Sequence, residues 1–283
     1  DFMSIRQILL HAPAFPDPVA DSLLEGAVCL AHLLGSSLTA QVAQLDSNPA
    51  SFRPILSGFI AGYREIVADL AADSEKNAAE ASDKLVKLCK QNKVALDMRR
   101  DFLRLNMPET RLIDLARLHD LIALPAPGPD AMDFSLAPSA IFRTGRPVLL
   151  FPRKRSLAQP DRVIVGWDFS REAARALKDA VPVLKLAKDI HIVGVTGEKE
   201  IVTTATATDL EKFMHAHGLS FHYRALEKQR ASVTEQLFDQ AREIDADLLV
   251  MGAYGHSRFS EFVLGGATLD ALDDPPLPIL LSH

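Results

Sequence analysis

Short apolar segments alternate with longer amphipathic segments along most of the chain. In the second half, residues 162–167 form an apolar run, and residues 170–187 then repeat alanine and leucine at helical spacing. Ser170 is a candidate N-cap for this helix, with the acidic Glu172 in its first turn. Apolar strands that alternate with helices predict a mainly parallel sheet covered by helices on both faces.

The same alternation continues to the end of the second half. Strands are predicted at residues 162–167, 190–195, 220–226, 248–251 and 278–281, and helices at 170–187, 208–217, 232–244 and 268–272. Gly218 follows the second of these helices as a candidate C-cap. The pattern therefore predicts one α/β unit with five strands.

The first half repeats this order of elements, which indicates an internal duplication. Residues 7–11, 119–124 and 146–151 correspond to residues 162–166, 246–251 and 277–282, and a helix at 21–34 and a strand at 37–43 complete the shared start. Ile8 and Leu121 are 113 positions apart, whereas Val163 and Leu248 are 85 positions apart. The first copy is therefore longer by 28 residues, which we assign to residues 46–73 and to a longer helix at 68–91.

Two tandem domains follow from the duplication, at residues 1–152 and 161–283. Residues 153–160 are polar, end in Pro160 and form the predicted linker. The 283 residues are 48% hydrophobic and 24% charged, which is typical of soluble globular proteins. The net charge of −6 argues against general affinity for nucleic acids or anionic membranes, and no apolar run approaches the roughly 20 residues that span a bilayer.

The two cysteines, Cys29 and Cys89, lie in separate apolar, helix-like runs. They lack the CxxC spacing of a metal or redox site, so we expect two small core residues. This cysteine usage favours a reducing compartment, and we expect a cytoplasmic protein.

A glycine-rich segment near the C-terminus carries the clearest chemistry. The apolar run 248–251 ends at Gly252-Ala253-Tyr254-Gly255, and nine residues later Gly265-Gly266-Ala267-Thr268 precedes the last predicted helix. Glycines allow close backbone approach, and free N–H groups at a helix start favour anions, so the segment is a candidate phosphate site. Tight turns are the alternative explanation. Neither GxxxxGK[ST] nor GxGxxG is present.

Asp168 follows the first strand of the second half, so it too is predicted at the carboxyl edge of the sheet, where ligands of α/β proteins bind. Its carboxylate could accept hydrogen bonds from a ribose or an adenine amino group. A capping or turn role ahead of the next helix is the alternative.

The corresponding edge of the first half lacks these residues. Pro13 stands where the second half has Asp168, and Pro125-Ala126-Pro127 stands where it has Gly252-Ala253-Tyr254. Proline removes the N–H donors that a phosphate needs. We therefore expect the first domain to be unable to bind a nucleotide.

These residues resemble the universal stress protein family in its tandem two-domain form. The shared features are a strand that ends in Asp and a motif G-x2-G-x9-G, here Gly252, Gly255 and Gly265. The resemblance is strong over residues 161–283 and rests on element order alone over 4–152. It implies two Rossmann-like α/β sandwiches, each with five mainly parallel strands, whose last strands, near Val148 and Ile279, pair as an intramolecular pseudo-dimer.

In ATP-binding members, the family pattern implies adenine and ribose contacts at Asp168 and an adenine contact from the backbone of Val195. It implies phosphate contacts at Gly252, Gly255, Gly265 and the two positions that follow. The candidate cofactor-binding residues are therefore Asp168, Val195, Met251, Gly252, Gly255, His256, Gly265, Gly266, Ala267 and Thr268. The expected cofactor is ATP, with or without Mg²⁺.

This chain departs from the family pattern at Gly266, which occupies the position of a Ser or Thr. The backbone amide of that residue is kept, but its hydroxyl is lost, and Thr268 lies two positions further on. His256 stands where a basic residue is common in the family, and it pairs with phosphate only if it is protonated. A solvated His256 is the alternative.

Other candidates have simpler explanations. Trp167 lies beside Asp168, either in an adenine pocket or packed in the core. His215, His217 and His222 have a metal-like composition, but residues two apart do not share a helix face, so we expect a solvated surface. No GxSxG or HExxH motif is present, and we assign no catalytic residue and no metal ligand.

We expect a binding and regulatory protein of the stress response that takes an adenine nucleotide in its second domain. The alternatives are a slow ATPase or nucleotidyl-transfer enzyme, and a scaffold or small-ligand protein without nucleotide affinity. A homodimer and an unidentified protein partner are both compatible with the sequence.

Overall fold

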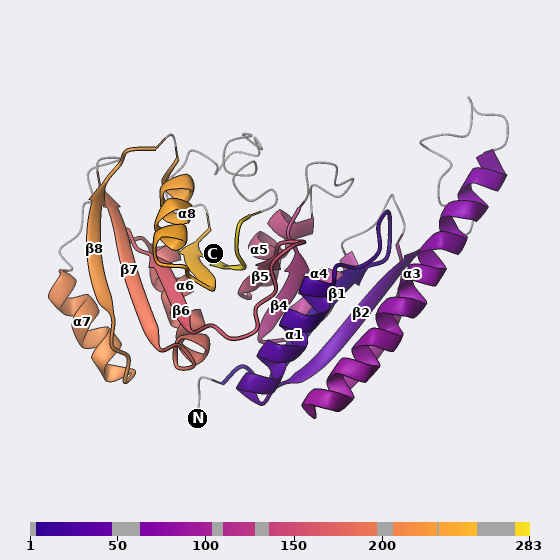
Figure 1. The fold of residues 1–283 in the computed structure, drawn as a ribbon, viewed down its shortest axis with the longest axis horizontal. Helices are drawn as coiled ribbons and strands as arrows, with labels where there is room; N and C mark the ends of the chain where they lie inside the picture. Colours follow the sequence, from indigo (N-terminus) through magenta and orange to yellow (C-terminus); the bar gives the residue numbers. More distant parts are fainter. Residues whose placement is uncertain are drawn as a thin grey trace.

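The computed structural model contains a single ten-stranded sheet that runs through both halves of the chain (Figure 1). The structure describes residues 4–46, 63–103, 110–127, 136–196, 206–230, 232–253 and 275–283. The strand order is β3-β2-β1-β4-β5-β10-β9-β6-β7-β8, so each half contributes five adjacent strands. This is the predicted α/β fold with two similar halves.

The elements of the first half are β1 (Gln7–Pro13), α1 (Asp21–Leu34), β2 (Ser37–Leu45), α3 (Tyr63–Asn92), β3 (Leu96–Leu103), α4 (Thr110–Ala116), β4 (Leu121–Pro125), α5 (Leu136–Thr144) and β5 (Val148–Phe151). The elements of the second half are β6 (Arg162–Gly166), α6 (Arg171–Leu184), β7 (Asp189–Thr196), α7 (Ala207–Ala216), β8 (His222–Glu227), α8 (Val233–Glu243), β9 (Leu248–Gly252) and β10 (Ile279–Ser282).

The two halves meet through their last strands. β5 and β10 pair antiparallel, with Leu149 opposite Leu280, whereas all other neighbouring strands pair in parallel. The predicted pairing of the strands near Val148 and Ile279 is therefore confirmed. It joins the halves into one body.

Equivalent hydrogen bonds in the two halves show the duplication. Asp120 N donates to Gln7 O at 3.0 Å, and Gln7 N donates to Asp120 Oδ2 at 3.0 Å. Asp247 N donates to Arg162 O at 2.8 Å, and Arg162 N donates to Asp247 Oδ2 at 2.8 Å. The same Asp therefore joins the first and fourth strands of each half at their amino ends.

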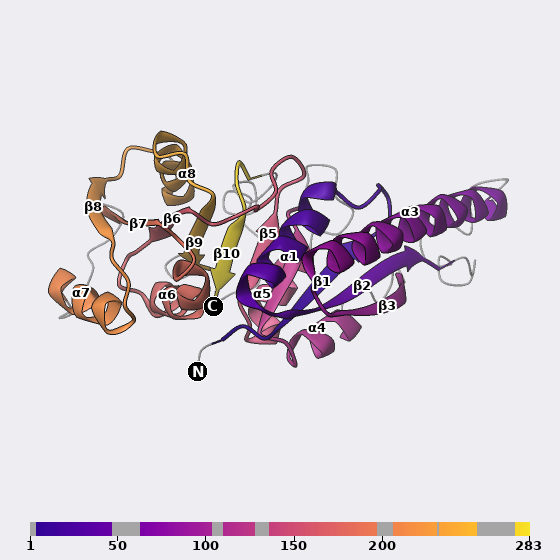
Figure 2. The ribbon, with the colours of Figure 1, turned by 60° about the horizontal axis from the view of Figure 1, so that its bottom comes forward.

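Helices cover both faces of the sheet. One buried cluster joins the strands to α1, α3, α6 and α7, and a second joins them to α4, α5 and α8. Figure 2 shows the first-half strands between α3 and α4, and the second-half strands between α8 and the pair α6 and α7. Alternate strand residues such as Ile8 and Leu9 enter different clusters, as the twofold repeat of a strand requires.

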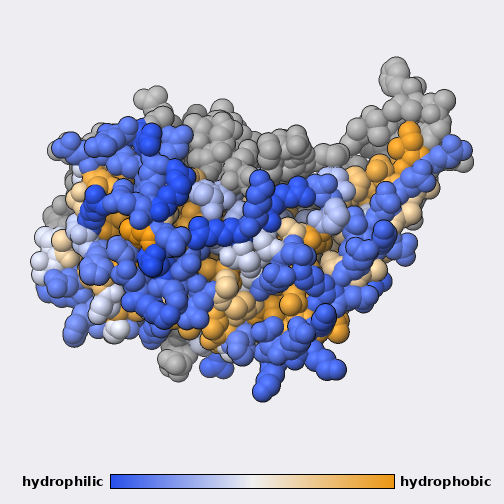
Figure 3. Space-filling view, in the orientation of Figure 1, coloured by the Kyte–Doolittle hydropathy of each residue, from blue (hydrophilic) through white to orange (hydrophobic). Residues whose placement is uncertain are grey.

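The long helix α3 accounts for most of the extra length of the first half. It has 30 residues, whereas its counterpart α7 has 10. One end of α3 extends beyond the sheet (Figure 1), where Ile66 and Leu70 are exposed. Figure 3 shows apolar surface along this end of α3, and elsewhere on this face apolar residues are interspersed with polar ones. No helix in the described ranges is long and apolar enough to cross a membrane.

Several local predictions are confirmed and others need correction. Ser170 caps α6, because its Oγ accepts from Ala173 N at 3.0 Å, and Gly218 ends α7 with a φ of +71°. The sequence pattern did not predict β3, α4 or α5. Cys89 is buried as expected, but Cys29 is only half-buried, and its Sγ donates to the linker carbonyl of Ala158 at 2.6 Å. The predicted helix at 268–272 lies outside the described residues.

Candidate functional site

The candidate site lies at the carboxyl ends of the second-half strands. The register of β6 and β9 places Val165 opposite Val250, so Asp168, just after β6, and Gly252, the last residue of β9, lie at the same edge. β7 lies on the other side of β6, and Val195 stands near its carboxyl end. The structure therefore brings these three predicted residues to one edge of the sheet.

Asp168 has a structural role in the described conformation. Its Oδ1 accepts a hydrogen bond from Ser170 N at 2.9 Å, just ahead of α6. This contact matches the capping alternative that the sequence left open.

Gly252 is explained by close packing. A Cβ on this residue would lie 2.6 Å from both Ala173 N and Glu172 C in the first turn of α6. Any side chain at position 252 would therefore press against helix backbone. The glycine allows β9 to approach α6, whether or not a ligand also binds there.

Two neighbouring predicted residues are packed into the sheet. Val195 is buried and pairs with Leu226 of β8, so its backbone belongs to the last pairs of β7. Met251 is partly buried and packs against the cluster beneath α8. The remaining predicted residues, Gly255, His256, Gly265, Gly266, Ala267 and Thr268, lie outside the described residues.

The turn between β6 and α6 has two features that the sequence pattern did not predict. Phe169 adopts a φ of +58°, in the left-handed region that non-glycine residues rarely occupy. Its ring meets the Trp167 indole edge to face, with centroids 5.3 Å apart. Trp167 packs partly against the core, and its Nε1 is buried without a hydrogen-bond partner among the described residues.

Glu172 is a buried carboxylate beside this turn, at the start of α6. Its Oε1 lies 2.7 Å from an Arg171 nitrogen. Burial of the carboxyl raises its pKa, but a backbone N–H, the Arg171 guanidinium and His283 outweigh this effect, and the pKa lies below its usual value. His283 is also near the site, since its Nδ1 lies 3.2 Å from Ala253 O.

The equivalent edge of the first half is built from different residues. Equivalent registers place Pro125 where the second half has Gly252, and Ala126 N donates to Phe151 O just as Ala253 N donates to Ser282 O, both at 2.8 Å. Pro13 ends β1 at the position that corresponds to Asp168. Asp168, which carries a carboxylate, and Gly252, which allows close packing, are thus both replaced by proline in the first half.

A buried polar network lies below the first-half edge instead. His11 Nδ1 lies 3.0 Å from Gln41 Oε1, Gln41 Nε2 donates to Asp101 Oδ2 at 2.7 Å, and Arg111 pairs with Asp101 Oδ1 at 2.8 Å. Burial lowers the pKa of His11 to about 4, although the hydrogen bond to Gln41 and the charge of Asp101 act in the opposite direction. His11 is therefore neutral at neutral pH. The network fastens α4 to the three outer strands of the first half.

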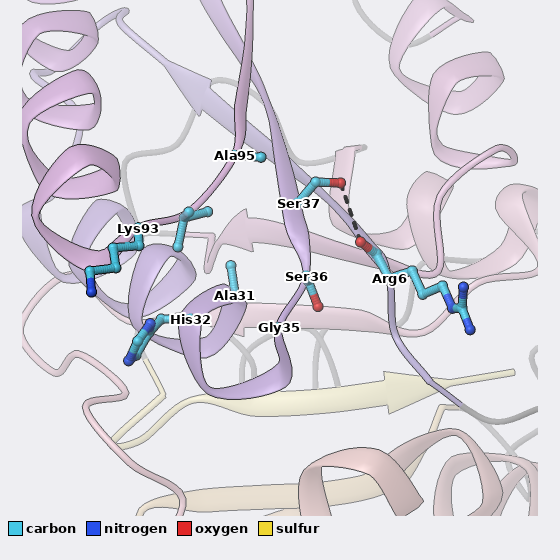
Figure 4. Close-up of a pocket in the computed structure, with 9 residues that line it drawn as sticks. Arg6, Ala31, His32, Gly35, Ser36, Ser37, Lys93 and Ala95 are labelled. Carbon is cyan, nitrogen blue, oxygen red and sulfur yellow. Dashed lines mark hydrogen bonds between the residues drawn. The ribbon is translucent and has the colours of Figure 1, made fainter. Parts of the chain in front are cut away.

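A pocket of about 360 Å³ lies at the opposite edge of the first half, where α1 and α3 end (Figure 4). Arg6, His32 and Lys93 line it, but Arg6 points away from the other two. A second pocket of about 350 Å³ lies beside β8 and α8, where Arg230 and Asp239 pair with each other. The first pocket lies away from the candidate edge, whereas the second lies at the carboxyl end of β8, where Leu226 pairs with Val195.

The histidines of the second half do not come together as a metal site. His217 Nε2 lies 3.3 Å from Lys178 Nζ, whereas the His222 ring lies beside the His191 ring, tilted by 35°, with centroids 5.3 Å apart. In the described ranges, no group of three or more His, Cys, Asp or Glu side chains is arranged to hold a metal ion.

Comparison with known proteins shows which solved structures share this fold. No protein-family model and no curated protein matches the chain. A universal stress protein from Archaeoglobus fulgidus DSM 4304 matches over 97% of this chain and 98% of its own, with 17% identity and a TM-score of 0.66. A putative universal stress protein from Pseudomonas aeruginosa UCBPP-PA14 matches over 99% of this chain and 94% of its own, with 15% identity and a TM-score of 0.61. The chain therefore has the full-length fold of these universal stress proteins.

Proposed function

We propose that this chain is a tandem universal stress protein that binds ATP, or another adenine nucleotide, in its second domain only. The domains are residues 1–152 and 161–283, with the linker between them. The full-length fold similarity supports the family assignment, and the residues at the two sheet edges support the choice of domain.

The difference between the two equivalent edges carries the proposal. Both halves have the same strand order and register, yet Asp168 and Gly252 stand in one where Pro13 and Pro125 stand in the other. Proline supplies no N–H, and a prolyl ring cannot replace a carboxylate as an acceptor. A phosphate-binding edge can therefore be built from the second half and not from the first.

The proposed contacts divide among three segments. Asp168 offers a carboxylate acceptor to a ribose or an adenine amino group, and the backbone near Val195 offers groups to the base. The segment 252–268 supplies glycine N–H groups for the phosphates, and Thr268 supplies a hydroxyl. Mg²⁺ enters with the nucleotide, since it usually binds through phosphates and few protein groups.

We propose a regulatory role for this binding. A ligand shifts a conformational equilibrium only if it binds one state more tightly than the other. The nucleotide would contact the turn after β6, the end of β7 and the segment after β9, so its occupancy would couple three neighbouring strands. No nucleophile or general base accompanies the site in the sequence, so we expect weak ATP hydrolysis at most.

The test is calorimetric titration of nucleotide-stripped protein with ATP and Mg²⁺. Asp168→Asn is the informative variant, because the amide oxygen can still accept from Ser170 N while the negative charge is lost. Asp69→Asn, on the exposed surface of α3, is the matched control. Gly252→Val is unsuitable, because its side chain would strike the backbone of α6.

The proposal is supported if ATP binding is saturable, weakens about tenfold in Asp168→Asn and is unchanged in Asp69→Asn. A tenfold change in affinity corresponds to roughly 1.4 kcal/mol, the scale of a hydrogen bond to a charged group. Absence of binding in the intact chain would contradict it and favour a scaffold without nucleotide affinity. Phosphate release that depends on Asp168 would instead identify a slow ATPase.

A further inference from the structure

The structure leaves one hydrogen-bond donor unused at the candidate edge. Trp167 Nε1 is buried and has no partner in the described part of the chain. An indole N–H only donates, and leaving such a donor unpaired in the interior is unfavourable. Buried polar atoms nearly always have a partner, so this exception calls for an explanation, and a bound ligand is one.

Trp167 is held firmly at this edge. Its backbone N donates to Val193 O at 2.9 Å, which fixes the residue between the ends of β6 and β7. Asp168 is the next residue in the chain, and Val195 lies two residues beyond Val193. The indole therefore shares its edge with both residues that we propose to contact the nucleoside.

The surrounding turn is strained in a way that maintains this arrangement. Phe169 holds a φ of +58°, which is unfavourable for a non-glycine residue, and its ring packs against the indole. Strained backbone residues cluster at active sites and ligand sites. The equivalent positions of the first half are Ala12, Pro13 and Ala14, which have neither an aromatic ring nor an indole N–H.

We infer that the Trp167 indole N–H donates a hydrogen bond to a ring nitrogen of the bound purine. This inference rests on the proposed nucleotide site and names the side chain that recognises the base. The N1, N3 and N7 atoms of adenine in a nucleotide are acceptors, and its amino group is a donor. An indole donor beside the Asp168 acceptor therefore matches both polarities of adenine.

The experiment uses the fact that Trp167 is the only tryptophan in the chain. The ligands are ATP and its 1-deaza, 3-deaza and 7-deaza analogues. Calorimetry measures their binding to the intact protein and to Trp167→Phe, and tryptophan fluorescence gives a second measurement for the intact protein. Phe keeps an aromatic ring and removes the donor. One analogue should bind the intact protein about 5–10-fold more weakly than ATP, the scale of one hydrogen bond, and Trp167→Phe should bind that analogue and ATP equally.

The other outcomes separate this inference from the proposed function. If ATP binds but Trp167→Phe changes its affinity and that of every analogue by the same factor, the inference is wrong and the nucleotide site stands. If ATP does not bind the intact chain, both fail. If Trp167→Phe does not fold, benzothienylalanine at position 167, which has sulfur in place of the N–H and nearly the same shape, gives the same comparison.

Discussion

Replacing Gly252 with alanine is expected to destabilise the nucleotide-free protein. The added Cβ would lie 2.6 Å from Ala173 N and 2.6 Å from Glu172 C, closer than real Cβ atoms come to other heavy atoms. Both atoms are backbone atoms of α6, whose first turn is fixed by the Ser170 cap, so relief requires the helix to move away from β9. Overpacking of a core costs about 1–3 kcal/mol, and we expect a value near the upper end.

The assay is urea unfolding of the nucleotide-free protein, followed by circular dichroism. Gly166→Ala is the matched control, because its Cβ would meet Leu237 Cδ1 at 2.8 Å, the mobile end of a side chain. The two substitutions reduce the freedom of the unfolded chain equally, so that effect cancels in the comparison. Gly166→Ala should lose less than about 1 kcal/mol, since isolated side-chain shifts are cheaper than backbone shifts. Equal stability of the two variants would refute the close packing of β9 on α6, and Gly252 would then need a ligand to explain it.

Three further predictions follow from single positions. Lys93→Gly should raise the free energy of unfolding by about 0.5–1 kcal/mol in a urea titration. Exposed Lys93 follows α3 with a φ of +57°, a conformation that glycine adopts without strain. An unchanged unfolding midpoint would contradict this prediction. Folding lowers the pKa of His11 to about 4, so the unfolded chain binds a proton at a higher pH than the folded chain does. The free energy of unfolding should therefore fall by about 2–3 kcal/mol as the pH drops from 6.5 to 4. The His11→Gln variant should lose that part of the pH dependence, and a pH profile identical to that of the intact protein would contradict the buried network. Gly266→Ser, which restores a hydroxyl at the family's Ser or Thr position, should tighten ATP binding severalfold in calorimetry, and weaker binding would contradict the proposed phosphate contact.

The sequence predicts those elements best whose apolar residues repeat regularly. The helix at Asp21–Leu34 matches its predicted bounds, and each predicted strand overlaps an observed one. β3 was missed because it is an edge strand that carries Arg99, Arg100 and Asp101. Asp101 is buried only because Gln41 and Arg111 hold its carboxylate, and no periodicity can reveal such partners.

The candidate site was predictable only in part. The carboxyl-edge rule was enough to place Asp168 and Gly252 at one edge, and the family resemblance added Val195. The sequence could not decide whether Asp168 caps a helix, because that depends on the fold of the turn around Phe169. Two further features could be seen only in the folded structure, because both depend on segments far apart in the chain. They are the contact of Gly252 with α6 and the unpaired Trp167 donor.

The number of ATP molecules bound per chain tests the central claim most directly. Equilibrium dialysis of the nucleotide-stripped, full-length chain against labelled ATP and Mg²⁺ gives this number without any substitution. We predict one ATP per chain, because only the second half combines Asp168 with the glycine segment. Two ATP per chain would contradict the assignment of the first half as non-binding, and no bound ATP at saturating concentrations would contradict the nucleotide site itself.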